Sequence, residues 1–130
     1  MTDGPLILVV EDNERNRKLV RDVLEHHGFR TLGAADGEDG VALAREHRPA
    51  LTLMDVQLPG IDGVEALGRL RADPATAGLR LVALTAFAMK DDRERLLAAG
   101  FDGYLVKPID VRSFADEVAS LVNGRAGGET

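Results

Sequence analysis

Five charged or polar side chains stand where the apolar runs of this sequence end. Glu11 and Asp12 follow the first run, and Asp55 follows the third. Thr85 follows the fourth run, and Lys107 lies at the end of the fifth. If the runs are parallel strands, their carboxyl ends meet at one edge of the sheet, where open α/β sheets bind their ligands. The sequence therefore predicts three carboxylates, one hydroxyl and one ammonium group in a single site.

Three carboxylates at one edge favour a bound cation. Two like charges about 4 Å apart repel by roughly 4 kcal/mol at an effective dielectric constant of about 20, and a proton, Lys107 or a metal ion can relieve this. An oxygen-only site with few protein ligands suits Mg²⁺, which keeps several waters. Asp12 and Asp55 are the predicted direct ligands. Glu11 could bind through water, and the backbone carbonyl of Gln57 could supply another oxygen.

The same residues suit phosphoryl transfer to a carboxylate, which needs a nucleophile, neutralised charge and donors to the phosphoryl oxygens. Asp55 can be the nucleophile, because carboxylates form aspartyl-phosphates. Mg²⁺ and Lys107 would neutralise charge, while the Thr85 hydroxyl and the N–H groups after Asp55 would donate hydrogen bonds. Each feature is commonplace alone, since an Asp after a strand is often a helix N-cap. Their occurrence at successive strand ends is what indicates this chemistry.

Short apolar runs alternating with helical patterns must position these groups. The predicted strands are Leu6–Val10, Thr31–Ala34, Leu51–Met54, Leu81–Leu84 and Tyr104–Val106. The helical patterns are the stripes Leu19–Leu24, Val64–Leu70 and Phe114–Val122, and the weaker stretches Glu38–Glu46 and Lys90–Ala99. Three runs are almost wholly apolar, as parallel strands covered on both faces are. Five βα units predict an α/β fold, a doubly wound five-stranded parallel sheet with five helices.

Length and composition bound the function. The 130 residues predict one domain over residues 1–123, a frayed tail over residues 124–130 and no output domain. The lack of cysteine excludes disulfides and thiolate metal sites. A net charge of −6 argues against nonspecific nucleic-acid binding. With no signal peptide and no apolar stretch near the roughly 20 residues of a membrane span, we expect a cytoplasmic protein that does not cross a membrane.

The motifs around these residues resemble those of response-regulator receiver domains. They are Val9–Asn13, Leu53–Gly63, Leu84–Ala86 and Tyr104–Pro108, and the likeness runs from about Leu6 to Val122. The resemblance implies a flavodoxin-like sheet with strand order 2-1-3-4-5. It also implies these roles: an acidic pocket at Glu11 and Asp12, phosphoacceptor Asp55, switch residue Thr85, switch aromatic Tyr104, phosphate-binding Lys107, and a cis bond before Pro108.

A receiver-like chain is expected to take its phosphoryl group from a phosphohistidine on a sensor histidine kinase or a histidine phosphotransfer protein. It would be a signalling phosphoacceptor that assists its own phosphorylation and dephosphorylation, rather than an enzyme. Effector proteins are expected to bind in trans to the face formed by the helix starting near Met89, the strand holding Tyr104 and the helix from about Val111 to Val122. Met89 itself could be core or partner surface.

Two short stretches of the sequence indicate which kind of receiver domain it resembles. The stretch Thr85–Lys90, with Glu11–Glu14, resembles stand-alone receivers of the DivK type, which belong to cell-division or phosphorelay circuits. Gln57 and Phe87, two residues past Asp55 and Thr85, are expected to flank the path of the water that hydrolyses the phosphoryl group. Neither is a good general base, so we expect slow self-hydrolysis.

The main alternative from another class is a Mg²⁺-dependent phosphatase of the haloacid-dehalogenase kind. Such an enzyme also uses an Asp after a strand, a Ser or Thr, and a Lys, but its second Asp, two residues on, is the general acid. Here that position is Gln57, which cannot transfer protons in this way. A nucleotide-binding module is disfavoured as well, because the turn Glu11–Glu14 has no glycine-rich phosphate cradle.

Overall fold

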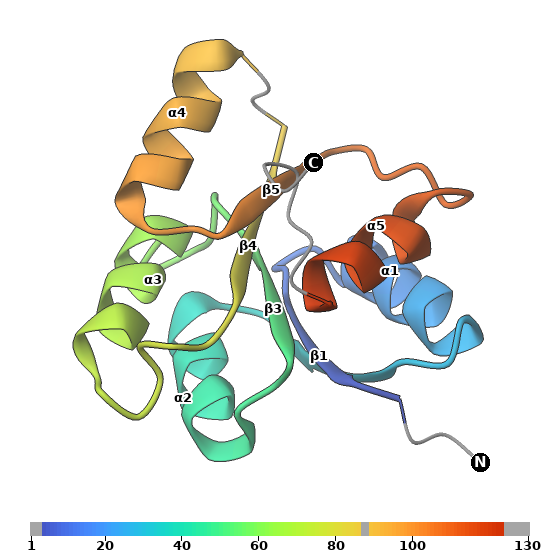
Figure 1. Cartoon of the computed structure of the whole chain (residues 1–130), viewed down its shortest axis with the longest axis horizontal. Coiled ribbons are helices and arrows are strands. Elements are labelled where there is room, and N and C mark those ends of the chain that lie inside the picture. Colours follow the sequence, from blue (N-terminus) through green and yellow to red (C-terminus); the bar gives the residue numbers. More distant parts are fainter. Residues whose placement is uncertain (1–3, 87–88, 124–130) are drawn as a thin grey trace.

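A computed structural model describes residues 4–86 and 89–123 as a parallel sheet with helices on both faces (Figure 1). The strands are β1 (Leu6–Val10), β2 (Arg30–Ala34), β3 (Leu51–Asp55), β4 (Leu81–Thr85) and β5 (Gly103–Val106). The helices are α1 (Glu14–His26), α2 (Gly37–His47), α3 (Gly63–Ala72), α4 (Lys90–Ala99) and α5 (Phe114–Val122). The strand order β2-β1-β3-β4-β5 confirms the predicted doubly wound, flavodoxin-like sheet.

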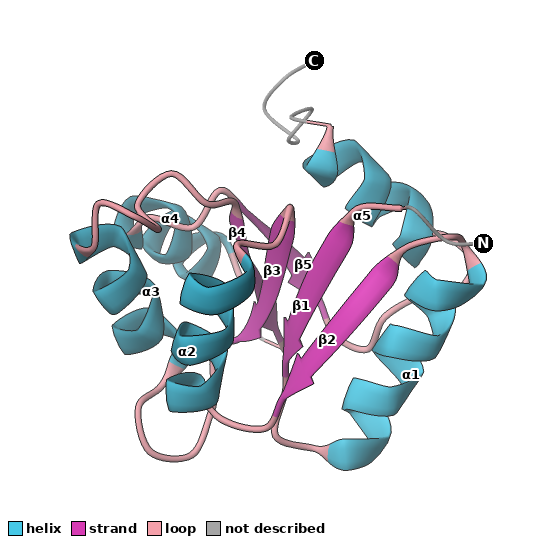
Figure 2. Ribbon diagram, turned by 90° about the horizontal axis from the view of Figure 1, so that it is seen from below, coloured by secondary structure: helices cyan, strands magenta, loops and turns pink. Residues whose placement is uncertain are grey.

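The sheet separates two hydrophobic cores. Figure 2 shows α1 and α5 on one face of the sheet and α2, α3 and α4 on the other. Alternate residues of a strand point to opposite faces. Leu8 and Val10 accordingly pack into the core under α2, α3 and α4, while Ile7 and Val9 pack into the core under α1 and α5. A strand buried from both sides is mostly apolar, which explains the nearly unbroken apolar runs in the sequence.

Local signals set where most helices begin and end. The side chains of Asn13, Asp36 and Asp62 cap α1, α2 and α3 by accepting a hydrogen bond from a backbone N–H three residues on. Gly28 follows α1 with a φ of 95°, a conformation that glycine adopts without strain. The three N-caps fix the helix starts at the carboxyl edge of the sheet, while Gly28 ends α1 at the opposite edge, beside Gly4.

The last helix starts later than expected. The sequence predicts a helix from about Val111, whereas α5 begins at Phe114. The Asp110 carboxylate accepts a hydrogen bond from the Arg112 N–H at 3.0 Å, and its carbonyl accepts from Ser113 and Phe114. An Asp that bonds its own backbone two residues on makes a turn in place of helix. A tight turn therefore separates β5 from α5.

Several large apolar side chains near α4 and β5 are exposed to solvent. Met89 is 75 % exposed, which settles its open assignment in favour of the surface. Leu97, Val106 and Val111 are large apolar side chains that are also exposed, all on the same part of the fold around α4, β5 and the turn before α5.

Across residues 4–86 and 89–123, the helices are all too short or too polar to traverse a lipid bilayer.

Candidate functional site

The predicted acidic pair lies directly past the end of β1. Glu11 is 2 % exposed, and its N–H donates to the Ala34 carbonyl at 3.0 Å. Its carboxylate accepts from the Asn13 N–H at 3.1 Å and pairs with the Lys107 ammonium at 2.9 Å. Asp12 is exposed. One carboxylate is therefore built into the protein while its neighbour faces solvent.

Asp55 is the last residue of β3 and is 5 % exposed. Its Oδ1 accepts from the Gln57 N–H at 2.9 Å, and its Oδ2 accepts from the Lys107 ammonium at 2.6 Å. The start of α3 lies close behind it, because a Cβ on Gly63 would come within 2.5 Å of the Asp55 carbonyl oxygen. A glycine is needed there, which gives the sequence Asp62–Gly63 a structural reason.

Lys107 ties two carboxylates together from the end of β5. Burial lowers the pKa of its ammonium group, but hydrogen bonds with Asp55 and Glu11 outweigh burial and raise the pKa above 10.5. Burial raises the pKa of the Glu11 carboxyl above 4.5, against the lowering effect of the hydrogen bonds from Lys107 and Asn13. The ammonium is thus charged, and it is the protein's own counter-ion for this pocket.

The three carboxylates suit a hard divalent cation. One oxygen from each of Glu11, Asp12 and Asp55 lies within 4.8 Å of the others. Three carboxylates and the Lys107 ammonium leave two negative charges, which a divalent ion would balance. Oxygen donors of this kind bind Mg²⁺ and Ca²⁺ rather than softer metals. Gln57 lies beside Asp55 through its N–H, and its carbonyl as a metal ligand stays a prediction.

Thr85 and Tyr104 lie on the neighbouring strands β4 and β5. Thr85 ends β4, is buried, and its carbonyl accepts from the Lys107 N–H at 2.8 Å. Tyr104 pairs with Ala83, two residues before Thr85, so the three side chains lie on the same face of the sheet. Tyr104 is half-buried, and its coupling to Thr85 stays a prediction.

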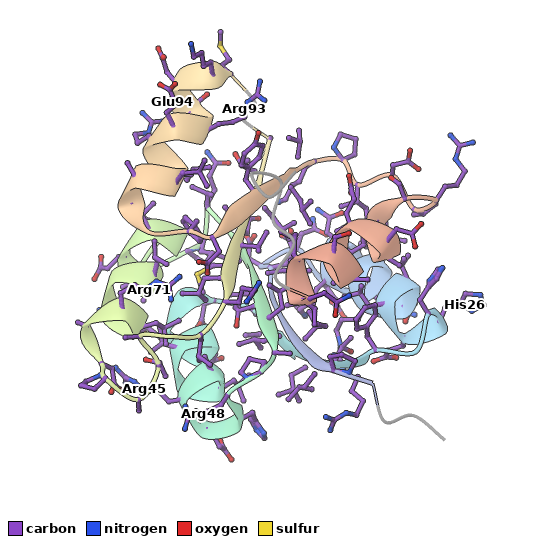
Figure 3. The ribbon with its side chains drawn as sticks, in the orientation of Figure 1. His26, Arg45, Arg48, Arg71, Arg93 and Glu94 are labelled. Carbon is purple, nitrogen blue, oxygen red and sulfur yellow. The ribbon has the colours of Figure 1, made fainter. Side chains whose placement is uncertain are left out.

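Two arginines contribute contacts that the sequence did not reveal. Arg93 of α4, labelled in Figure 3, donates to the Tyr104 hydroxyl at 3.1 Å. Its guanidinium lies 5.7 Å from the ring centroid. Arg17 of α1 donates to the Glu11 backbone carbonyl at 2.8 Å. Neither contact follows from spacing, since a long side chain can reach many partners across a folded surface.

A cleft opens beside the pocket. A cavity of about 340 Å³ is bordered by Asn16, Leu19 and Val20 of α1 and by the turn Lys107–Ile109. Glu11 and Lys107, which form an ion pair, both line this cavity, so the cleft reaches the Glu11 side of the pocket. The Lys107–Pro108 bond is cis, as the resemblance implies. Phe87, expected at the water path, lies outside the described residues, while Gln57 is described and exposed.

Comparison with known proteins agrees with this geometry. The response regulator receiver domain family matches residues 7–119. The polar-differentiation response regulator DivK of Brucella anthropi is 44 % identical over 116 residues, covering 89 % of this chain and 94 % of that protein. DivK of Brucella ovis is 43 % identical over the same length and with the same coverage.

Solved structures give the same picture. The receiver domain of a sensor histidine kinase from Pseudomonas aeruginosa, which has a magnesium ion coordinated in its active-site cleft, superposes with a TM-score of 0.83 at 35 % identity. The match covers 92 % of this chain and 98 % of that one. Chemotaxis protein CheY4 of Vibrio cholerae shares the fold with a TM-score of 0.84 at 24 % identity, over 91 % of this chain and 98 % of that one. These matches favour a receiver over the haloacid-dehalogenase alternative.

Proposed function

The chain belongs to the response regulator receiver domain family, and we propose that it accepts a phosphoryl group on Asp55 with the help of Mg²⁺. The observation that carries the proposal is the contact set of Asp55. A buried carboxylate at a strand end has its two oxygens on the Gln57 N–H and the Lys107 ammonium, within 4.8 Å of two further carboxylates. Such a group is electrostatically supported, as a nucleophile must be, and its partner Lys107 also lines the neighbouring cleft.

Each side chain then has a defined part in the transfer. An Asp55 oxygen forms the new P–O bond while the P–N bond to the donor imidazole breaks, and the imidazole leaves as its neutral or protonated form. Mg²⁺ held by Asp12 and Asp55, with Glu11 beside it, would neutralise charge on the phosphoryl oxygens. Lys107 exchanges its contact with Asp55 for one with a phosphoryl oxygen. The Thr85 hydroxyl donates to another.

Partners follow from the family and from the exposed surfaces. We propose that a sensor histidine kinase or a histidine phosphotransfer protein donates the phosphoryl group through the cleft beside α1, in the cytoplasm. Effectors would bind in trans to α4, β5 and α5, where Met89, Leu97 and Val106 are exposed apolar side chains. The likeness to polar-differentiation regulators supports an output in cell polarity or division. Residues 1–123 would form the receiver unit.

Intact-mass measurement after treatment with acetyl phosphate tests the phosphoacceptor. We expect one added phosphoryl group in the wild type with Mg²⁺, and none in Asp55→Asn or in excess EDTA. Asp62→Asn is the matched control, since Asp62 is an exposed carboxylate in the same β3–α3 connection and Asn can still cap α3. Full labelling of Asp55→Asn would refute the assignment.

A second arm of this experiment separates a receiver from a phosphatase. A receiver holds its phosphoryl group and assists its own dephosphorylation slowly. A phosphatase would instead turn over many equivalents of a small phosphoester. Sustained hydrolysis of such an ester, lost in Asp55→Asn, would favour the phosphatase alternative.

A further inference from the structure

Glu11 is held by its backbone as well as by its carboxylate. β1 ends at Val10, and past that point the Glu11 N–H still bonds to the Ala34 carbonyl at the end of β2. The Glu11 carbonyl oxygen turns to a side chain instead, and accepts from Nη1 of Arg17 at 2.8 Å. The residue thus has partners for its N–H, its carbonyl and both carboxylate oxygens. Such a set of contacts fixes one orientation of the β1–α1 turn.

Arg17 is placed for this contact by the fold. It lies in the first turns of α1, with its N–H bonded to the Asn13 carbonyl at 2.9 Å, and long side chains on a helix lean toward the N-terminus. Figure 2 shows α1 running alongside β2. The stem of Arg17 crosses β2 at Gly33, where a Cβ would lie 3.2 Å from its Cδ. Gly33 therefore leaves the room that the side chain needs.

The anchored carbonyl bears on the cation site. The carbonyl of Glu11 lies in the planar peptide unit that leads to Asp12. Holding this oxygen holds the plane, and with it the direction in which Asp12 leaves the backbone. We propose that Arg17 is a positioning residue that preorganises Glu11 and Asp12 for a divalent cation. The inference rests on the proposed Mg²⁺ site, and it adds a residue that touches neither the ion nor the phosphoryl group.

Arg17 has two opposing effects on metal affinity. Its positive charge repels a cation, so removing the charge alone would tighten metal binding. Its hydrogen bond orients the ligands, so removing the bond would weaken metal binding. Arg17 is partly exposed, and salt screens charges that face solvent. We therefore expect the positioning effect to dominate at physiological ionic strength.

Calorimetric titration with Mg²⁺ tests the sign in the full chain. Partners that orient ligating groups typically contribute about 10- to 100-fold in metal affinity. Because Arg17 acts through the backbone, we expect a smaller loss of about three- to tenfold in Arg17→Ala. Arg17→Lys keeps an N–H donor and should recover part of the loss.

A matched control lies one turn along the same helix. Arg21 also crosses β2 at Gly33, but it donates to the Thr31 hydroxyl at 2.9 Å rather than to Glu11. Arg21→Ala should therefore bind Mg²⁺ as the wild type does. A readout without metal is amide hydrogen exchange at Asp12 and Asn13, which should become faster in Arg17→Ala and stay unchanged in Arg21→Ala.

The outcomes separate this inference from the proposed function. If the wild type binds Mg²⁺ and Arg17→Ala binds it equally or more tightly, the positioning role is overturned while the metal site stands. An equal loss in Arg21→Ala would also overturn it, because the cause would be general packing of α1 on β2. If the wild type binds no Mg²⁺, the proposed metal site and this inference fall together.

Discussion

Every residue of β3 and β4 is buried, whereas every residue of the neighbouring strand β5 is at least partly exposed. The helices above them differ in the same way, since α3 buries Gly63, Ala66, Leu67 and Leu70, while the buried residue of α4 is Leu96. The strands that carry Asp55 and Thr85 are thus fixed in the core, and the α4–β5 segment rests on it lightly. A reactive site works best when its groups are held rigidly, while a signalling surface must be able to adopt a second conformation at low free-energy cost.

Polar ties hold the lightly packed segment, and they differ at its two ends. Far from the site, Arg71 of α3, labelled in Figure 3, donates to the Gly100 carbonyl at 2.9 Å and to Asp102 at 2.9 Å. Asp102 also accepts from the Leu81 N–H. Near the site, Arg93 contacts the Tyr104 hydroxyl. Arg71 and Asp102 therefore anchor the C-terminal end of α4, and we expect α4 to shift about that end.

The largest expected effect breaks the anchor. Arg71 also donates to the carbonyls of Ala77 and Leu79, so Arg71→Ala would leave several acceptors without this donor. At roughly 1 kcal/mol for each net hydrogen bond, we expect a loss of about 3 kcal/mol in the free energy of unfolding, measured by urea denaturation. Arg69→Ala is the control, because its exposed pair with Glu65 is worth less than about 1 kcal/mol. Equal losses in both variants would show that the anchor is no stronger than a surface ion pair.

The contrast between core and periphery also decides what the sequence could reveal. The bounds of β1 and α4 agree with the predicted Leu6–Val10 and Lys90–Ala99. The gathering of Glu11, Asp55 and Lys107 followed from parallel topology alone, because strand ends share an edge. Apolar runs and topology are properties of the chain that local patterns express.

The features that the sequence did not reveal depend on reach in three dimensions. The contacts of Arg17, Arg71 and Arg93 join residues that only the folded chain brings together, and two of the three are bonds to backbone carbonyls. A carbonyl leaves no mark in the sequence. The late start of α5 likewise depends on one side chain, because the Asp110 carboxylate accepts a hydrogen bond from the backbone N–H two residues on.

The second prediction concerns how phosphorylation at Asp55 changes the conformation of the α4–β5 segment. In our hypothesis the phosphoryl group draws the Thr85 hydroxyl inward, which opens space for the Tyr104 ring to rotate in. A charge-assisted hydrogen bond worth about 1.5–3 kcal/mol gives a shift in partner affinity of roughly ten- to a hundredfold. Thr85→Ala should still accept the phosphoryl group at Asp55 yet lose most of that shift.

Partner affinity and amide chemical shifts would check this coupling. In the wild type, phosphorylation should move shifts in α4, β5 and α5, and in Thr85→Ala those changes should shrink. A variant that keeps the full affinity change, or wild-type shifts confined to the pocket, would show that Thr85 and Tyr104 are not coupled in this protein.

The smallest expected effect concerns the contact between α4 and β5 that lies near the site. The guanidinium of Arg93 bonds the Tyr104 hydroxyl and lies over its ring, so it stabilises the ring in its present position. If Tyr104 turns inward on phosphorylation, this contact is lost, and it therefore opposes the switch. An exposed cation–π contact is worth about 0.5–1 kcal/mol, so Arg93→Ala should raise the partner affinity of the unphosphorylated protein about two- to fivefold. The affinity of the phosphorylated form should stay close to that of the wild type, because the contact is already broken there.

Matched variants separate this contact from other effects on α4. Glu94→Ala alters the neighbouring residue on the exposed outer side of α4 and should leave the unphosphorylated affinity unchanged (Figure 3). Tyr104→Phe removes the hydroxyl that accepts from Arg93 but keeps the ring, so its effect should be smaller than that of Arg93→Ala. The double variant Arg93→Ala, Tyr104→Phe then closes a double-mutant cycle, in which residues in contact give non-additive changes. Strict additivity, or a fall in unphosphorylated affinity in Arg93→Ala, would mean that Arg93 does not restrain Tyr104, and that light packing alone sets the balance between the two positions of the ring.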